Sequence, residues 1–392
     1  MLFVFLGKKL ISVDTICPVL MAVKNRNPKS KIFLFTLDKK TIEEIKKNIV
    51  LYSFIAHNTT IFQIGGSSKN VYKKALQKFL WSVILVAIFL TLLLKAAKAI
   101  HFGSLHKWPY KLLSVCNKQR ILFFENNCWG YSPTVVAVDQ AYSENSRHPD
   151  TKTTASKTMV GFSKDWPYLC ENQNFSVDKY LVAPSRSWPA WTGFIEKDCL
   201  QIWEEEQNRH GLNNNSKVVF FALGAISSLP YLDFQDQSIA KVVEKTCKIL
   251  LSADPDIFIF LKPHPITNLE ELDKVVRNLS SNRIVITHLH PSLVARYAEL
   301  AICNYYSTTM ADCHLLGIKT VEYTRYNKTS LAITNGKSLR PEVISDFIDI
   351  ENEDRLSQRV KEILIEGKLK EQKKLKKAYT IDEQYLIDKL AF

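Results

Sequence analysis

The sequence predicts an α/β protein with two doubly wound domains, and three observations lead to this prediction. Short apolar runs alternate with stretches of helical length and periodicity, a pattern typical of parallel strands connected by helices. The alternation starts at the N-terminus and restarts after an asparagine-rich polar stretch at residues 208–216. With 392 residues, 46% of them apolar, the chain is long enough to bury two cores.

The N-terminal half contains the first series of strands. Apolar or β-branched runs predict strands at residues 2–6, 32–37, 61–64, 121–124 and 135–138. Helices are expected after Asp14 and over residues 42–49. We expect this half, residues 1–207, to form a Rossmann-like domain.

Residues 79–94 are the most unusual segment, because sixteen residues pass without a charge between lysine-rich flanks. A helix of this length spans about 24 Å, which is shorter than the roughly 30 Å hydrocarbon core of a bilayer. Two interpretations stay open: a helix buried in the domain core, or one that dips into a single leaflet with its lysines on anionic headgroups.

The second series of strands follows residue 216. Strands are predicted at residues 218–223, 257–261, 284–286, 300–303 and 320–323, with helices at 239–251, 269–279, 293–298 and 309–316. Residues 208–345 are therefore expected to form a second Rossmann-like domain. The remaining residues, 346–392, are expected to form C-terminal helices that pack back across the joint.

The charge and the cysteines limit the class of partner. Fifty-two Lys and Arg against 39 Asp and Glu give a net charge of +13, which favours anionic partners such as nucleotides or lipid surfaces. Nucleic acid is disfavoured, because the sequence has no Cys/His finger spacing and no RNP-type aromatic motif. The eight cysteines form no C-x-x-C pair, which favours reduced thiols in the cytoplasm over a zinc site or a disulfide framework.

The sharpest chemical signal is Lys262-Pro263-His264-Pro265, directly after a predicted strand. Ligands of open α/β sheets bind at the carboxyl ends of the strands, where this motif would emerge. The prolines restrict the backbone, so a cation and an imidazole would be held in place to stabilise a phosphate leaving group. The alternative is a rigid turn in which His264 bonds only the backbone.

Two further elements point to the same edge of the sheet. The hydroxyl side chains of Ser307, Thr308 and Thr309 follow the predicted strand 300–303 and precede a helix, an arrangement that suits an anion. Simple N-capping is the alternative, although it needs one hydroxyl only. Gly224 follows strand 218–223 and would let a phosphate approach the backbone.

The order of these motifs resembles the nucleotide-binding domain of GT-B glycosyltransferases. More narrowly, residues 217–323 resemble the bacterial capsule and surface-polysaccharide group, which includes Kdo transferases, polysialyltransferases and CDP-glycerol glycerophosphotransferases. The resemblance implies two Rossmann-like domains that face a cleft. It also implies that Lys262 and His264 contact the phosphate of a cytidine nucleotide, with Ser307, Thr308 and Thr309 on the opposite wall. The chain departs from the family at Asn304-Tyr305-Tyr306-Ser307, where the teichoic-acid-type enzymes usually have Asp-Tyr-Ser-Ser.

An inverting transfer needs a carboxylate that accepts the proton of the acceptor hydroxyl. Glu125, at the end of strand 121–124, is the first candidate in the N-terminal domain, and Asp14 is the second. Glu322, at the last predicted strand (320–323), is the candidate that would hold a ribose. No Asp-x-Asp or His/carboxylate cluster indicates a metal, so we expect transfer without a metal ion or cofactor.

The function expected from the sequence is therefore glycosyl transfer from a nucleotide-sugar donor to a glycan or lipid-linked acceptor in surface or capsular polysaccharide biosynthesis. We expect a cytoplasmic protein at the inner face of the cell membrane. The alternatives are a CDP-glycerol-type phosphotransferase, a sugar-nucleotide 2-epimerase and a non-catalytic membrane-associated adaptor. The sugar, the acceptor, the linkage stereochemistry and the oligomeric state stay open.

Overall fold

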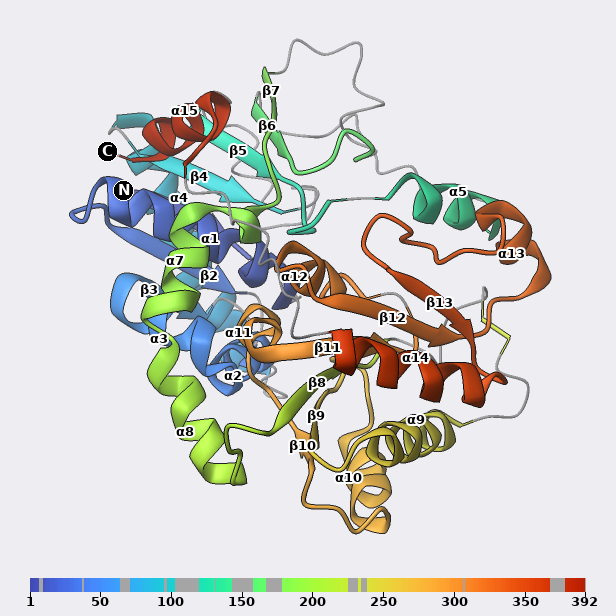
Figure 1. Cartoon of the computed structure of the whole chain (residues 1–392). Helices are drawn as coiled ribbons and strands as arrows, with labels where there is room; N and C mark the ends of the chain where they lie inside the picture. The colour runs from blue at the N-terminus through green and yellow to red at the C-terminus, as the bar shows by residue number, and fades with distance from the viewer. Residues whose placement is uncertain are drawn as a thin grey trace. The chain divides into compact units, whose positions relative to one another are not determined.

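The structure is a computed structural model that describes residues 1–6, 10–36, 39–63, 71–94, 97–102, 120–130, 132–142, 158–166, 178–224, 232–233, 238–305, 307–366 and 378–391. The chain forms two compact units, shown in Figure 1. The first unit comprises Met1–Tyr131, Asn145–Gly193 and Lys376–Phe392, and the second comprises Ser132–Glu144 and Phe194–Leu375. The division at Gly193 lies inside α7 (Pro189–Lys197), so α8 (Leu200–His210) belongs to the second unit.

The first unit is built on a seven-stranded parallel sheet with strand order β3-β2-β1-β4-β5-β6-β7. The strands are β1 (Leu2–Phe5), β2 (Ile32–Thr36), β3 (Thr60–Gln63), β4 (Lys98–His101), β5 (Ile121–Phe124), β6 (Thr158–Gly161) and β7 (Asp178–Leu181). The central strands β1 and β5 are fully buried, which explains their continuous apolar sequences. The edge strands β3 and β7 are largely exposed.

Helices cover this sheet (Figure 1). They are α1 (Leu10–Arg26), α2 (Lys39–Lys47), α3 (Ile49–Asn58), α4 (Val71–Leu94) and, from the C-terminus, α15 (Ile381–Leu390). α15 starts with a capping box between Thr380 and Glu383 and packs on α1, to which the Arg26–Asp388 ion pair also connects it. The C-terminus therefore returns to the unit in which the chain begins.

The apolar run 79–94 forms most of α4. Four of its side chains, Trp81, Leu85, Ile88 and Leu92, recur at helical spacing and pack in one core cluster with residues of β1, β2, β4 and β5. This stripe is part of the domain core, as expected from the interpretation of a buried helix. The opposite face of the helix is exposed. Among the described helices, none has both the length and the hydropathy of a bilayer-spanning segment.

The second unit is built on a six-stranded parallel sheet with strand order β10-β9-β8-β11-β12-β13. The strands are β8 (Lys217–Ala222), β9 (Ile257–Lys262), β10 (Ile284–Ile286), β11 (Ala298–Cys303), β12 (Lys319–Thr324) and β13 (Asp346–Asp349). The helices are α5 (Pro133–Tyr142), α8, α9 (Ile239–Ala253), α10 (Leu269–Asn278), α11 (Pro291–Tyr297), α12 (Met310–Leu315), α13 (Lys328–Thr334) and α14 (Glu353–Glu366). α9 and α14 pack together on one side of the main apolar core.

One local prediction is wrong. Residues 135–138 were expected as a strand but lie in α5, because Pro133 starts a helix in which Val135, Val138 and Tyr142 recur at helical spacing. Residues 98–101 were not predicted as a strand, and they form β4 between β1 and β5.

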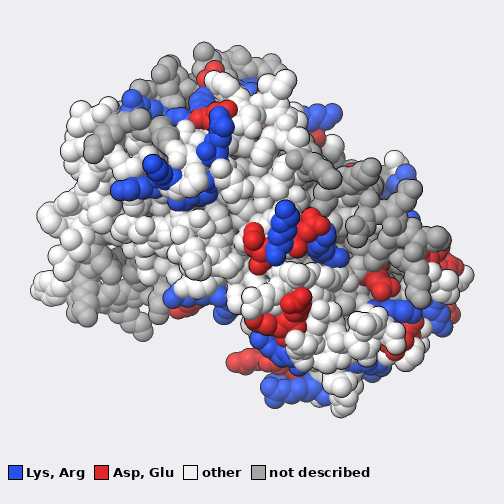
Figure 2. Space-filling model, turned by 60° about the vertical axis from the view of Figure 1, so that its left-hand side comes forward, with Lys and Arg blue, Asp and Glu red and all other residues white. Residues whose placement is uncertain are grey.

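The surface seen in Figure 2 is uneven in charge. A wide area at its left carries no Lys, Arg, Asp or Glu, whereas charged side chains of both signs gather toward the lower right.

Candidate functional site

The candidate site lies at the C-terminal edge of the sheet in the second unit. All six strands are parallel, so the segments that follow β8, β9, β10 and β11 leave the sheet at the same edge. Neighbouring strands are about 4.8 Å apart, and β9 and β11 lie on either side of β8. The ends of β9 and β11 are therefore about 10 Å apart across β8.

His264 follows β9 with one side of its ring fixed. Its Nδ1 accepts a hydrogen bond from the backbone N–H of Ile266 at 3.3 Å. Burial lowers the pKa of His264 below its usual value. The imidazole is therefore neutral at pH 7 with its proton on Nε2, and this N–H is a donor that can face a ligand.

Lys262, the last residue of β9, is already engaged. Its ammonium donates to the backbone carbonyl of Leu289 at 2.8 Å. Leu289 follows β10, so the ammonium is held on the β10 side of β9, away from β11. This contact connects two loops of the site to each other.

The hydroxyl segment after β11 adopts an arrangement that differs from ordinary N-capping. Ser307 Oγ and Thr309 Oγ1 are 2.8 Å apart and hydrogen-bond each other. Thr309 occupies the N-cap position of α12, but its side chain makes no capping bond. All three hydroxyl residues, Ser307, Thr308 and Thr309, are partly exposed, whereas Tyr306 lies outside the described residues.

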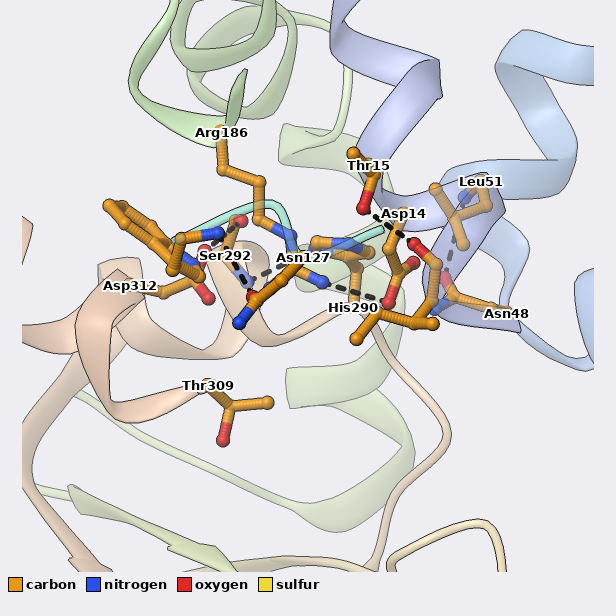
Figure 3. Close-up of polar contacts among 12 residues, drawn as sticks. Asp14, Thr15, Asn48, Leu51, Asn127, Arg186, His290, Ser292, Thr309 and Asp312 are labelled. Atoms are coloured by element: carbon orange, nitrogen blue, oxygen red, sulfur yellow. Dashed lines mark hydrogen bonds and ion pairs between the residues drawn. The ribbon is translucent and has the colours of Figure 1, made fainter. Parts of the chain in front are cut away.

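A second connection joins α11 and α12, the helices that follow β10 and β11. Ser292 Oγ donates to the carboxylate of Asp312, and both residues are buried (Figure 3). His290 is fully buried and caps α11, with Nδ1 accepting from the Ser292 N–H at 3.1 Å. Sequence reasoning missed these residues, although a second His-Pro pair after a predicted strand, at His290-Pro291, was a usable signal.

Gly224 is required by close packing. A Cβ at this position would lie 2.6 Å from the Cβ of Tyr305 and 3.2 Å from its carbonyl oxygen. Any side chain would push the segment after β8 away from the segment after β11. The glycine therefore sets how closely the segments after β8 and β11 approach each other.

Glu322 lies within β12 and is fully buried. Its Oε1 accepts a hydrogen bond from the hydroxyl of Tyr326 at 2.5 Å, and Tyr326 is itself buried. A fully buried carboxylate that is hydrogen-bonded to a buried tyrosine is not accessible to a ribose. Its role in this conformation is structural.

The first unit contains the two candidate bases. Asp14, on α1, forms an ion pair with Arg186 at 2.8 Å, in which the arginine side chain is 3% exposed and the aspartate 16% (Figure 3). Arg186 lies in a short 3-10 helix at Ser185–Ser187, and its pairing with Asp14 could not be found from the sequence because 172 positions separate the two.

Glu125 directly follows β5 and is fully buried. Its Oε2 accepts hydrogen bonds from the backbone N–H groups of Phe162 and Ser163, at 2.5 and 3.1 Å. These bonds fix the segment after β6 to the end of β5. Such contacts are those of a structural carboxylate.

The comparisons with known proteins concern the fold. No protein-family model matches the chain, and no curated protein matches it. Among solved structures, a putative UDP-N-acetylglucosamine 2-epimerase from Listeria monocytogenes is similar with a TM-score of 0.58 and 9% identity, over 98% of this chain and 94% of that one.

Two other solved structures are similar over almost the whole of both chains. The UDP-GlcNAc 2-epimerase of Neisseria meningitidis, bound to UDP-GlcNAc, has a TM-score of 0.58 at 11% identity over 100% of this chain and 99% of that one. Arabidopsis thaliana UGT89C1, complexed with UDP, has a TM-score of 0.54 at 10% identity with the same coverage. These likenesses confirm the predicted GT-B-like fold of two Rossmann-like units.

Proposed function

We propose that the chain is a glycosyltransferase that binds a nucleotide-activated sugar at the C-terminal edge of the sheet in the second unit. The observation that carries the proposal is that a neutral His264 follows β9 while the hydroxyl side chains of residues 307–309 follow β11. These segments lie on either side of the end of β8, where ligands of open α/β sheets bind.

In this proposal the phosphate of the donor takes its hydrogen bonds from both walls. The Nε2–H of His264 donates from one wall, and the hydroxyls of Ser307, Thr308 and Thr309 donate from the other. Negative charge grows on the leaving phosphate as the glycosidic bond breaks, so donors fixed in advance stabilise the transition state more than the ground state. Lys262 contributes its positive charge from the β10 side and keeps the loops in place through Leu289.

For the acceptor side we propose Asp14 as the base and not Glu125. Asp14 is partly exposed and is oriented by Arg186, whereas Glu125 is fully buried with backbone partners. In this proposal Asp14→Asn lowers kcat by at least about a hundredfold and leaves donor affinity within about twofold. An equal loss in donor affinity would exclude Asp14 from the role of base.

The identity of the donor is part of the proposal. The resemblance of the motifs favours a cytidine nucleotide and a role in surface or capsular polysaccharide biosynthesis at the cytoplasmic face of the membrane. Two of the similar structures contain UDP or UDP-GlcNAc, which adds uridine nucleotides as candidates. We propose that the transfer uses no metal ion, since the hydrogen-bond donors of the site stabilise the leaving group.

A thermal-shift screen with CMP, CDP, UDP and GDP tests the proposal. A ligand present at a hundred times its Kd stabilises a protein by about 2.7 kcal/mol, so the matching nucleotide should raise the Tm by several degrees. Inorganic phosphate at the same concentration is the control for unspecific anion binding. If all four nucleotides leave the Tm unchanged, the proposal fails and a non-catalytic adaptor is favoured.

A sugar-nucleotide 2-epimerase is the second candidate, favoured by the structural likeness to two such enzymes over at least 98% of the chain. The two functions differ in their need for an acceptor. We expect that UDP-GlcNAc incubated with the protein alone keeps its configuration at C2, measured by proton NMR of the sugar. Inversion at C2 without an acceptor would establish the epimerase in place of the transferase.

A further inference from the structure

The outer face of α4 is a continuous apolar surface. Eight large apolar side chains on this helix are each between 45% and 79% exposed. They are Leu76, Phe79, Leu80, Val83, Val86, Leu90, Leu93 and Leu94. Single exposed apolar residues are common on proteins, but a row of this length indicates a surface that is covered in use.

The geometry of α4 suits contact with a flat surface. Its 24 residues form a rod of about 36 Å, and the buried stripe of Trp81, Leu85, Ile88 and Leu92 fixes the rod on the core along its length. The exposed row therefore stays on the solvent side and has a fixed orientation. A helix held in this way can lie in the plane of a lipid interface with its apolar side in the acyl region.

The charged residues within α4 are of one sign. Its sequence contains Lys73, Lys74 and Lys78 in the N-terminal half and no Asp or Glu from Val71 to Leu94. At the C-terminal end, the guanidinium of Arg120 donates to the carbonyl of Leu92 at 2.7 Å.

Further cations gather near this C-terminal end. Burial, together with the positive charges of Lys389 and Arg120, lowers the pKa of Lys98 to about 8. Lys98 therefore lies close to two other cations, and these three positive charges attract an anion that approaches them. An apolar face next to cations of this kind is complementary to an anionic lipid surface.

We infer that α4 is a docking surface for an anionic phospholipid monolayer, with its outer face in the acyl boundary and the cluster of Lys98, Arg120 and Lys389 against the headgroups. The inference is independent of the proposed donor pocket, because it uses residues of the first unit only. A second copy of the chain is a poorer occupant, since a symmetric contact between two α4 helices would bring like charges together.

Flotation with large unilamellar vesicles tests the inference. The full chain should bind vesicles of phosphatidylcholine with 30% phosphatidylglycerol and bind pure phosphatidylcholine vesicles at least about tenfold more weakly. The double variant Val83→Glu/Leu90→Glu should lose at least about tenfold in binding to the anionic vesicles. Lys389→Gln, which removes one cation, should cost about fivefold.

Ile49→Glu/Ile381→Glu is the matched control, because it introduces the same charges at exposed apolar positions of two other helices in the same unit. The control should bind like the wild type, and circular dichroism should show all variants folded. Equal binding of the α4 variant and the wild type would overturn the inference. So would a wild-type dimer that the α4 variant dissociates while neither protein binds vesicles, because α4 would then be a self-association surface.

Discussion

At the residue level, burial decides the protonation of His264. Its pKa is lower in the folded chain than the usual 6.5, so the unfolded chain binds the proton more strongly. The stabilising contribution of the neutral imidazole is therefore complete above about pH 6.5 and is lost as the pH falls toward the folded pKa. This sign gives a measurable consequence for stability.

We expect the free energy of unfolding of the wild type to decrease from pH 7 to pH 5 more steeply than that of His264→Gln, which cannot take up the proton. Urea unfolding at pH 7, 6 and 5 measures the difference. His57→Gln, at an exposed histidine, is the control and should follow the wild type. Parallel pH profiles for the wild type and His264→Gln would show that folding does not lower this pKa.

Two glycines give opposite predictions for the same substitution. Gly224→Ala should destabilise the protein by about 1–3 kcal/mol, because the new Cβ meets Tyr305 at 2.6 Å. Gly193→Ala should stabilise it by about 0.5–1 kcal/mol, since Gly193 lies within α7 with no atom within 4 Å of an added Cβ. Chemical denaturation measures both, and effects of the same sign would contradict the packing described for Gly224.

In the Asp14–Arg186 pair the arginine is buried and the aspartate is partly exposed, so removal of Asp14 leaves a buried cation without its ion-pair partner. We expect Asp14→Ala to cost about 3 kcal/mol, because the guanidinium of Arg186 stays 3% exposed. Arg186→Met should cost a similar amount, while the double variant should cost less than the sum of the two. Additive costs in this double-mutant cycle would show that the ion pair contributes no coupling energy.

Sequence reasoning proposed the residues of the candidate site in the second unit but not the contacts of their side chains. Lys262, His264 and the hydroxyls at 307–309 were chosen because they lie at or after the ends of strongly apolar strands, and such strands end at a common edge. The contact of Lys262 with Leu289 and the burial of Glu322 depend on loops and on packing between distant residues. Motifs and apolar periodicity in the sequence carry no information on such contacts.

At the level of elements, continuous apolar runs located most of the buried strands. The predicted limits of β5 and β10 match the structure to the residue, and those of β1, β8 and β9 match to within one. The strands β4, β6, β7 and β13 were missed. Of these, β7 and β13 lie at sheet edges, where short sequences such as DKYL and DFID carry charges. The interior strands β4 and β6 were missed because their short sequences, KAIH and TMVG, contain no continuous apolar run. The helix α5 was missed because β-branched residues favour a strand until their spacing is considered.

The helices α11 and α12, which follow β10 and β11, are connected by the hydrogen bond from Ser292 to Asp312. We expect Ser292→Ala to cost about 1–3 kcal/mol, since the substitution removes a donor from the buried carboxylate of Asp312. It should also weaken nucleotide binding, because Asp312 is in α12, directly after the hydroxyl residues. Ser53→Ala, in α3 of the other unit, is the control for nucleotide affinity. Loss of stability without loss of affinity would separate this contact from the site.

For the whole molecule, the fold was predictable from the sequence. The boundaries of the two units were not, because two segments of the chain pack in the unit other than that of their neighbours in sequence. Two parallel sheets follow from two series of apolar runs, and the likeness to solved structures of TM-score 0.54 to 0.58 confirms this architecture. The chain enters the second unit at residues 132–144, before its main entry at Phe194, and α15 returns to the first unit. These excursions are fixed by packing on α13 and α1, and no composition change in the sequence marks them.

The claim on which the function depends is that His264 donates a hydrogen bond to a nucleotide phosphate. Isothermal titration calorimetry with the nucleotide that stabilises the protein most measures it directly, on the wild type, on His264→Ala and on His57→Ala. A hydrogen bond to a charged group contributes about 1.5–3 kcal/mol, so His264→Ala should weaken binding by at least about tenfold, with His57→Ala unchanged. Equal affinities of the wild type and His264→Ala would contradict the account.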